Sequence, residues 1–210
     1  MRYAISDIHG CSKTFRRALD LIDLDKTDDE LFLLGDYIDR GPDSLGVLQT
    51  IWRLEEEGYR IKCLMGNHEE MYINRSEYSD YQRALPESER AAATEWMKKL
   101  HNYAFTPGYL LVHAGLNFRH PNPLADTHAM RWVRYWYGDL DRGWLGENII
   151  VHGHTPETQT SIDFGIQHMA QTQRACIDSG CSHETHGMRY LTVLNLDTQD
   201  ATYVRNVEEE

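Results

Sequence analysis

Short apolar runs, each followed by Gly, Asp, Asn or His, alternate with longer amphipathic stretches in the first third of the chain. Apolar runs of about four residues are typical of buried strands, which we expect at residues 3–6, 31–34 and 61–65. Between them, apolar residues recur with the 3.6-residue period of a helix. We expect Ser12 to cap the first helix, and Asp43 or Ser44 to cap the second, which Gly58 closes. This strand–helix alternation predicts an α/β fold with a mainly parallel, helix-covered sheet.

The pattern changes in the second third of the chain. Residues 70–105 are polar and contain Pro86, and they predict a helical insertion of two helices, the second at about 87–103. Further strands are expected at 109–112, 148–151, 175–177, 190–196 and 201–204, whereas 117–146 is aromatic and weakly periodic. Because no repeat, linker or low-complexity segment is visible, we expect a single domain over 1–210.

Composition narrows the choice of partners. The net charge is −12, from 33 acidic and 21 basic residues, which argues against nucleic acid and anionic membranes as partners. No apolar run approaches the roughly 18 residues of a membrane span, and the N-terminus lacks a signal-peptide core. The four cysteines show no CxxC spacing, so we expect reduced thiols in a cytoplasmic protein. The oligomeric state cannot be inferred.

Ligand-type side chains follow five of the predicted strands. In chain order they are Asp7 with His9, Asp36, Asn67 with His68, His113, and His152 with His154. In α/β sheets, ligands collect outside the carboxyl ends of the strands. Oxygen and imidazole donors without cysteine suit Mn, Fe or Zn. We therefore expect a metal site at this edge.

The stretch 31–41 is the centre of this pattern. Gly35 turns the backbone after a strand, and Asp36, Asp39 and Arg40 follow. We expect Asp7 and His9 to point the same way from an extended backbone and to share one ion. Asp36, on the neighbouring strand, can bridge two ions, and Asn67 adds an uncharged oxygen. Each residue alone has a plainer interpretation as a cap or turn, but their coincidence at five strand ends favours two metal ions.

These residues stand in the motifs SDIHG (6–10), GDYIDRG (35–41), GNHE (66–69), HAG (113–115) and GHT (153–155). With them, nearly the whole chain resembles the metal-dependent phosphoprotein phosphatases, especially compact bacterial and phage members. The resemblance implies the layered metallophosphoesterase sandwich, in which helices flank central mixed sheets. It also implies two divalent ions, for which we expect Mn²⁺, with Fe and Zn as alternatives.

The resemblance further implies a role for each motif residue. The first ion would be held by Asp7, His9 and Asp36. The second ion would be held by Asp36, Asn67, His113 and His154. We expect His152 to support a ligand rather than bind metal itself.

The remaining roles concern the substrate. His68 would be the general acid, oriented by Asp39. Phosphate would be bound by Arg40, by Asn67 and by a second arginine two positions after a tryptophan. We choose Arg134 for that second position, with Arg131 as the alternative.

The expected reaction is in-line hydrolysis of a phosphate monoester by a bridging hydroxide that two ions generate, with no phospho-enzyme. We expect a serine/threonine phosphoprotein phosphatase, because Glu70 and Met71 follow GNHE. The alternative is a symmetrical dinucleoside polyphosphate (diadenosine tetraphosphate) hydrolase. A metal-stabilised binding module without turnover is disfavoured, since it would not need the pair of His68 and Asp39.

Three departures from the family pattern bear on the substrate. Ser6 replaces a usual glycine, and Met65 stands where many protein phosphatases have arginine. After Cys181, the sequence SHETHGM replaces a glycine-rich turn, and we expect this loop, with His183, Glu184 and His186, to be solvated. We also expect the aromatic run 132–137 to pack against the core, except for Arg134, and Cys11 and Cys181 to serve packing.

Overall fold

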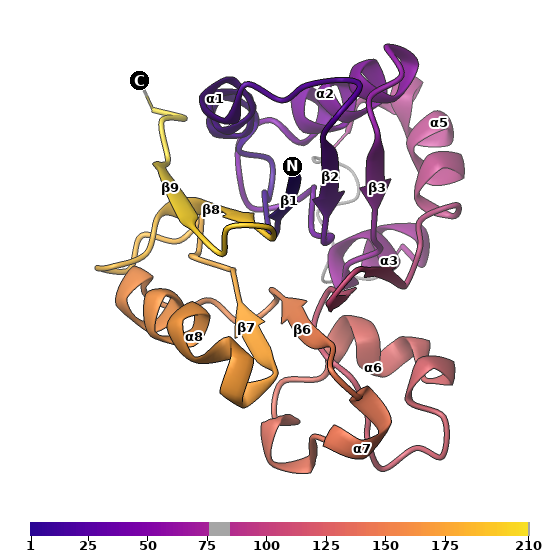
Figure 1. Ribbon diagram of the computed structural model, residues 1–210. Helices are drawn as coiled ribbons and strands as arrows, with labels where there is room; N and C mark the ends of the chain where they lie inside the picture. The colour runs from indigo at the N-terminus through magenta and orange to yellow at the C-terminus, as the bar shows by residue number, and fades with distance from the viewer. Residues whose placement is uncertain (76–84, 210) are drawn as a thin grey trace.

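Two mixed β-sheets face each other in the computed structural model, which describes residues 1–75 and 85–209 (Figure 1). The five-stranded sheet has the order β3-β2-β1-β8-β9, with β1 Arg2–Ile5, β2 Glu30–Leu33, β3 Ile61–Cys63, β8 Tyr190–Asn195 and β9 Ala201–Arg205. The four-stranded sheet has the order β4-β5-β6-β7, with β4 Tyr103–Thr106, β5 Tyr109–Val112, β6 Ile149–His152 and β7 Arg174–Cys176. The expected α/β class with mixed sheets flanked by helices is confirmed.

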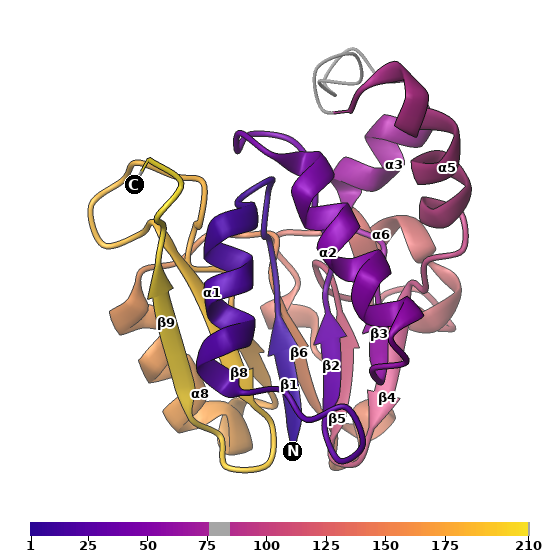
Figure 2. The same cartoon turned by 90° about the horizontal axis from the view of Figure 1, so that it is seen from above.

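Strand direction explains how the site is assembled. In the first sheet β1, β2 and β3 are parallel, and in the second β5, β6 and β7 are parallel. Figure 2 shows β1, β2 and β3 running in the same direction, so their carboxyl ends lie at one edge. The loops that carry the predicted ligands leave from such ends.

The core consists of three apolar layers, as the alternation of side chains along each strand requires. Ile5 of β1 packs outward with residues of α1 Ser12–Ile22 and α2 Ser44–Glu56, whereas Ala4 faces the space between the sheets. In β5, Leu111 joins the layer between the sheets and Leu110 packs outward with the 117–146 region. Burial on both faces explains why these strands are continuous apolar runs.

The aromatic region contains only short elements. They are η1 Pro123–Ala125, α6 Thr127–Trp132, η2 Tyr137–Asp139 and α7 Arg142–Leu145. Trp136 is 2% exposed and donates from its indole nitrogen to the carbonyl of Ala114, at 3.1 Å. The expectation that this run packs against the core is correct for Trp136 but wrong for Tyr135, which is 96% exposed.

Several predicted boundaries differ from the structure. The predicted helical insertion, 70–105, contains α5 Glu87–Met97 and the end of α3 Asn67–Ile73, which begins three residues earlier. Residues 76–84 lie outside the described part. The helix expected to reach residue 103 is too long: β4 begins at Tyr103, because this segment pairs with β5 through the tight turn at Gly108, where φ is +83°. Polar composition alone could not reveal that pairing.

Two helix predictions also need correction. Cys11, not Ser12, is the N-cap of α1, and the Ser12 hydroxyl instead donates to Asp43, 2.5 Å away. Asp43 caps α2 as expected, accepting from the Gly46 amide at 2.8 Å. The helix α8 Gln159–Thr172 was not predicted, although its buried side chains follow helical spacing. Among the described residues, no helix has the length and apolar character needed to span a membrane.

Candidate active site

Asp36 lies at the centre of the predicted ligands. Its Oδ1 is 3.5 Å from His113 Nε2, and its Oδ2 is 3.5 Å from His9 Nε2. Within the described part of the chain, ligand-type atoms form two buried clusters, and both include Asp36. One holds Asp36 with His9 and His68, and the other Asp36 with His113 and His154. One carboxylate therefore faces two positions, as a bridging ligand must.

Backbone carbonyls fix the orientation of two imidazoles. Nδ1 of His9 lies 3.0 Å from the carbonyl of Ile38, and Nδ1 of His113 lies 2.8 Å from that of Leu34. A carbonyl only accepts, so each Nδ1 donates and each Nε2 keeps its lone pair toward the centre. Burial lowers the pKa of His9 to about 3, which keeps that ring neutral, as a metal ligand must be.

Two observations show that these residues fit divalent ions. Nε2 of His154 is buried and has no hydrogen-bond partner among the described residues, and burial lowers the pKa of this ring to about 3. Oδ1 of Asn67 lies 3.0 Å from Nε2 of His113, so two lone pairs face each other in the neutral tautomer. A bound cation would give the His154 nitrogen a partner, and it would remove the repulsion between the lone pairs of Asn67 and His113.

Asp7, the predicted ligand that follows β1, belongs to neither of these two clusters but lies beside His9. Its Oδ1 is 3.9 Å from His9 Nε2, while its Oδ2 accepts from the Ser6 hydroxyl and from the His154 amide, the latter at 3.0 Å. Burial raises the pKa of Asp7, and a bound divalent cation would counteract that effect by favouring the carboxylate. Ser6, the first departure from the family pattern, therefore directly contacts this carboxylate.

The backbone around the centre is unusual. Positive φ angles occur at six of the predicted site residues: Asp7 +55°, His9 +46°, Asp36 +56°, Asp39 +68°, Arg40 +65° and His154 +70°. The expectation of an extended Asp7-x-His9 segment is therefore wrong. Non-glycine residues adopt this region rarely, and it costs about 1–3 kcal/mol per residue. The surrounding contacts must hold these turns, and such strain is common where side chains are aimed at a ligand.

Glu69, to which sequence reasoning assigned no role, is buried and connects the loops that follow β2 and β3. Its carboxylate accepts from the amides of Gly66, Asp36 and Tyr37 at 3.0, 2.9 and 2.8 Å. Gly35 permits this close approach, since a Cβ there would lie 2.5 Å from the Gly66 nitrogen. Glu69 thus fixes the loop that carries Asp36, and its place in GNHE was the only available signal.

His68 and Asp39 form the predicted pair. Nδ1 of His68 is 2.8 Å from Oδ2 of Asp39, and its Nε2 is 3.9 Å from Oδ2 of Asp36. Burial opposes protonation, but the carboxylates of Asp36 and Asp39 outweigh it and raise the pKa of His68. A protonated imidazole held by a carboxylate fits a general acid. Because His68 also lies in one of the two ligand clusters, its role as an acid or as a metal ligand is tested by measuring the metal content of a His68 variant.

The structure distinguishes between the two candidate arginines. Nη1 of Arg134 donates to the His154 carbonyl at 3.1 Å and lies 3.4 Å from Thr155 Oγ1, which holds the guanidinium beside the ligand loop. Arg131 instead pairs with Glu70 at 2.9 Å and donates to Asn102 at 2.6 Å. Arg134 therefore lies beside a predicted ligand loop, whereas Arg131 is engaged in packing contacts, and the phosphate-binding role of Arg134 stays a prediction.

Two histidines outside the ligand sets are also placed. Both ring nitrogens of His152 are engaged, Nδ1 with the Gly153 carbonyl at 3.0 Å and Nε2 with the Tyr137 hydroxyl at 2.9 Å, so neither remains for a metal.

His183 was expected to be solvated, but its Nε2 lies 2.9 Å from Nη1 of Arg40. The exposed Glu184 and His186 agree with the expectation for that loop. Cys11 and Cys181 are buried free thiols.

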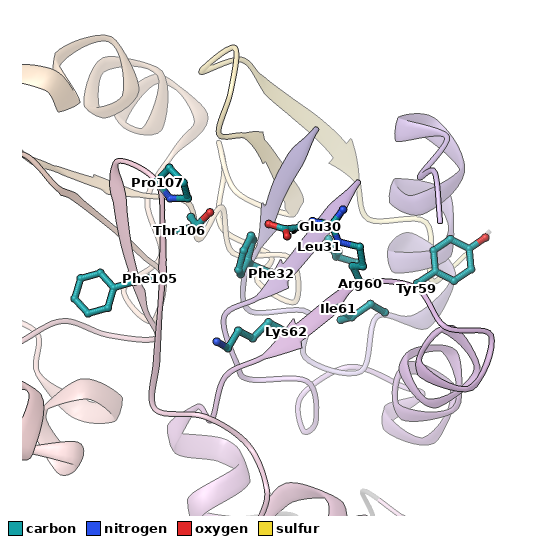
Figure 3. Close-up of a pocket in the computed structure, with 10 residues that line it drawn as sticks. All are labelled: Glu30, Leu31, Phe32, Tyr59, Arg60, Ile61, Lys62, Phe105, Thr106 and Pro107. Atoms are coloured by element: carbon teal, nitrogen blue, oxygen red, sulfur yellow. Dashed lines mark hydrogen bonds and ion pairs between the residues drawn. The ribbon is translucent and has the colours of Figure 1, made fainter. Parts of the chain in front are cut away.

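A cavity of about 420 Å³ lies at the opposite ends of the strands (Figure 3). It is lined by residues of β2 and β3 that include Phe32 and Lys62, and by the end of β4 with the turn that follows it, including Phe105. The predicted ligands follow the other ends of β2, β3 and β5. This cavity is therefore separate from the metal centre.

Comparison with known proteins agrees with this geometry. Residues 3–191 match the family model described as calcineurin-like phosphoesterase. This chain belongs to the calcineurin-like phosphoesterase family. The family implies a dinuclear site for divalent metals, and the two clusters that share Asp36 could hold such ions.

Two curated relatives carry the name of a specific hydrolase. The chain is 34% identical over 121 residues to a symmetrical bis(5′-nucleosyl)-tetraphosphatase of Nitrosospira multiformis, a match that covers 54% of this chain and 43% of that protein. The protein of that name from Nitrosomonas europaea is 36% identical over 121 residues, covering 54% and 44%. The match thus spans less than half of each curated relative.

One solved structure shows how widely the fold is shared. It is a protein serine/threonine phosphatase from Saccharomyces cerevisiae with similarity to human phosphatase PP5, with a TM-score of 0.76. The match covers 98% of this chain and 80% of that chain at 13% identity. At that identity the likeness concerns the fold alone.

Proposed function

We propose that this protein is a metal-dependent hydrolase that cleaves dinucleoside polyphosphates symmetrically. The observation that carries the proposal is the 34–36% identity to symmetrical bis(5′-nucleosyl)-tetraphosphatases. The site supports it chemically, because two clusters of metal-ligand type share Asp36, and Arg40 and Arg134 lie beside them. Guanidinium groups match phosphate oxygens well, and a tetraphosphate offers many such oxygens.

The proposal replaces the expectation of a phosphoprotein phosphatase. That expectation used Glu70 after GNHE, but Glu70 accepts from the guanidinium of Arg131 and the indole of Trp132. It thereby anchors α6 to α3, and this packing role accounts for Glu70 without reference to a phosphoprotein substrate. The likeness to the yeast serine/threonine phosphatase concerns only the fold.

The proposed reaction breaks one phosphoanhydride bond. Water attacks one of the two inner phosphorus atoms of a dinucleoside tetraphosphate, and the central bridging oxygen leaves with the other half. The products are two nucleoside diphosphates. Two bound divalent ions would supply charge neutralisation and acidify the attacking water.

The side chains of the site supply orientation and a proton. Arg40 and Arg134 would bind oxygens of the attacked phosphate, with the Asn67 amide beside them. His68, held by Asp39 at 2.8 Å, would donate a proton to the leaving oxygen. These roles are part of the proposal.

A direct comparison of substrates tests the proposal. Purified protein with Mn²⁺ is assayed on diadenosine tetraphosphate, on a phosphoserine peptide and on p-nitrophenyl phosphate. We expect the highest kcat/KM on diadenosine tetraphosphate, with ADP as the sole nucleotide product by anion-exchange chromatography. The Asp36→Asn variant, as the matched control, should be inactive on all three. Formation of AMP and ATP, or faster turnover of the peptide, would contradict symmetrical tetraphosphate hydrolysis.

A further inference from the structure

The guanidinium of Arg40 lies between two imidazoles. Nη1 is 2.9 Å from Nε2 of His183, a well-formed hydrogen-bond distance, whereas Nη2 is 3.5 Å from Nε2 of His68, at the outer limit of one. Only the contact with His183 is therefore short enough to fix the position of a proton. Arginine has donors only, so Nε2 of His183 must accept this hydrogen bond and carry no proton. Burial and the charge of Arg40 lower the pKa of His183, in agreement with a neutral ring.

His183 is held at the base of its loop rather than at its tip. The amides of His183 and Arg189 both donate to the carbonyl of Gly180, at 2.9 and 3.0 Å. These two hydrogen bonds hold both ends of the loop against the same residue. Gly180 has a φ of +63°, and a Cβ there would lie 3.3 Å from the Cβ of His183. These contacts therefore fix the position of the His183 backbone, from which the imidazole extends.

Arg40 itself needs such support. It is exposed, and it lies in a tight turn with a φ of +65°. A long side chain in this setting has many rotamers, and ordering one on binding costs about 0.5–1.5 kcal/mol. A fixed acceptor beside the guanidinium removes part of that cost before substrate arrives.

We propose that His183 is a positioning residue that orients the Arg40 guanidinium toward the substrate phosphate. The loop of residues 182–188 replaces the usual glycine-rich turn of the family pattern, so this contact is a feature of this chain's own sequence. The inference rests on the proposed role of Arg40 as a phosphate-binding residue. It assigns His183 no contact with the reacting atoms.

The test measures phosphate binding directly. Inorganic phosphate is titrated into Mn²⁺-loaded protein by calorimetry, and KM and kcat are measured on p-nitrophenyl phosphate. His183→Ala should raise the phosphate Kd and KM by about 2- to 13-fold, the range that the rotamer cost converts to, with kcat and metal content nearly unchanged. His183→Gln, which retains an acceptor, should restore most of the affinity. His186→Ala, an exposed histidine of the same loop, should match wild type.

A double-mutant cycle shows whether His183 acts through Arg40. In an Arg40→Ala background, His183→Ala should cause no further loss of phosphate affinity. The inference is overturned if His183→Ala binds phosphate like wild type, if His183→Gln loses as much affinity as His183→Ala, or if the full loss persists without Arg40. An Arg40→Ala variant with wild-type phosphate affinity would instead refute the phosphate role of Arg40. Normal phosphate binding without tetraphosphate hydrolysis would refute the proposed function alone.

Discussion

Replacement of His68 by asparagine should have an effect that depends on the leaving group. In the structure, Asp39 holds Nδ1 of this ring at 2.8 Å, while Nε2 faces the centre, 3.9 Å from Asp36. Asparagine is smaller and cannot donate a proton as an acid. The substitution therefore removes the proposed proton donor and leaves the predicted metal ligands in place.

The expected magnitude follows from how strongly each leaving group needs a proton. Loss of a general acid reduces the rate by about 10²–10⁴-fold when proton transfer belongs to the slow step, or about 2.7–5.4 kcal/mol. A serine alkoxide is a poor leaving group, so phosphoserine hydrolysis should show that full loss. The terminal phosphate of a nucleoside diphosphate has a second pKa of about 6 by analogy with phosphoserine, so it departs more easily. Diadenosine tetraphosphate and p-nitrophenyl phosphate should therefore be affected much less.

The assay compares kcat/KM of wild type and His68→Asn on these three substrates, with metal content measured by atomic emission. Asp39→Asn should reproduce the pattern more mildly, because it weakens the orientation of the imidazole without removing it. Equal losses on all three substrates would refute the general-acid role. Loss of an ion from His68→Asn would show that His68 is a metal ligand, which its place in one ligand cluster makes a real alternative.

Three further predictions concern the metals and the arginines. Exhaustive chelation should abolish turnover and lower the melting temperature, with Mn²⁺ restoring activity better than Mg²⁺, because imidazole ligands suit Mg²⁺ poorly; full activity in excess chelator would refute this. Asp36→Asn should reduce activity more than Asn67→Asp, since Asp36 faces both clusters, and two ions retained in Asp36→Asn would contradict its bridging role. Arg134→Ala should raise KM at unchanged metal content, whereas Arg131→Ala should mainly lower the melting temperature, because Arg131 pairs with the half-buried Glu70. The reverse pattern would restore Arg131 as the phosphate-binding residue.

Local sequence determined the types of element and the chemistry of the site. Apolar runs located most strands to within one or two residues, because burial on both faces of a sheet requires such runs. It also placed Asp36 after β2 and Asn67 after β3, where the loops of a parallel sheet converge. The exact element boundaries and the existence of β4 could not be predicted in this way, because they depend on pairing with other strands, as β4 pairs with β5.

The tertiary structure decided which of these residues meet and how. Left-handed turns at Asp7 and His9 aim both side chains, and no residue spacing encodes a φ angle for a non-glycine residue. The sequence favoured Arg134 over Arg131 only by its spacing from Trp132, whereas a long-range contact directs Arg131 toward Glu70. The contact between Arg40 and His183 spans 143 residues and two loops, so only the folded chain could bring that donor and acceptor together.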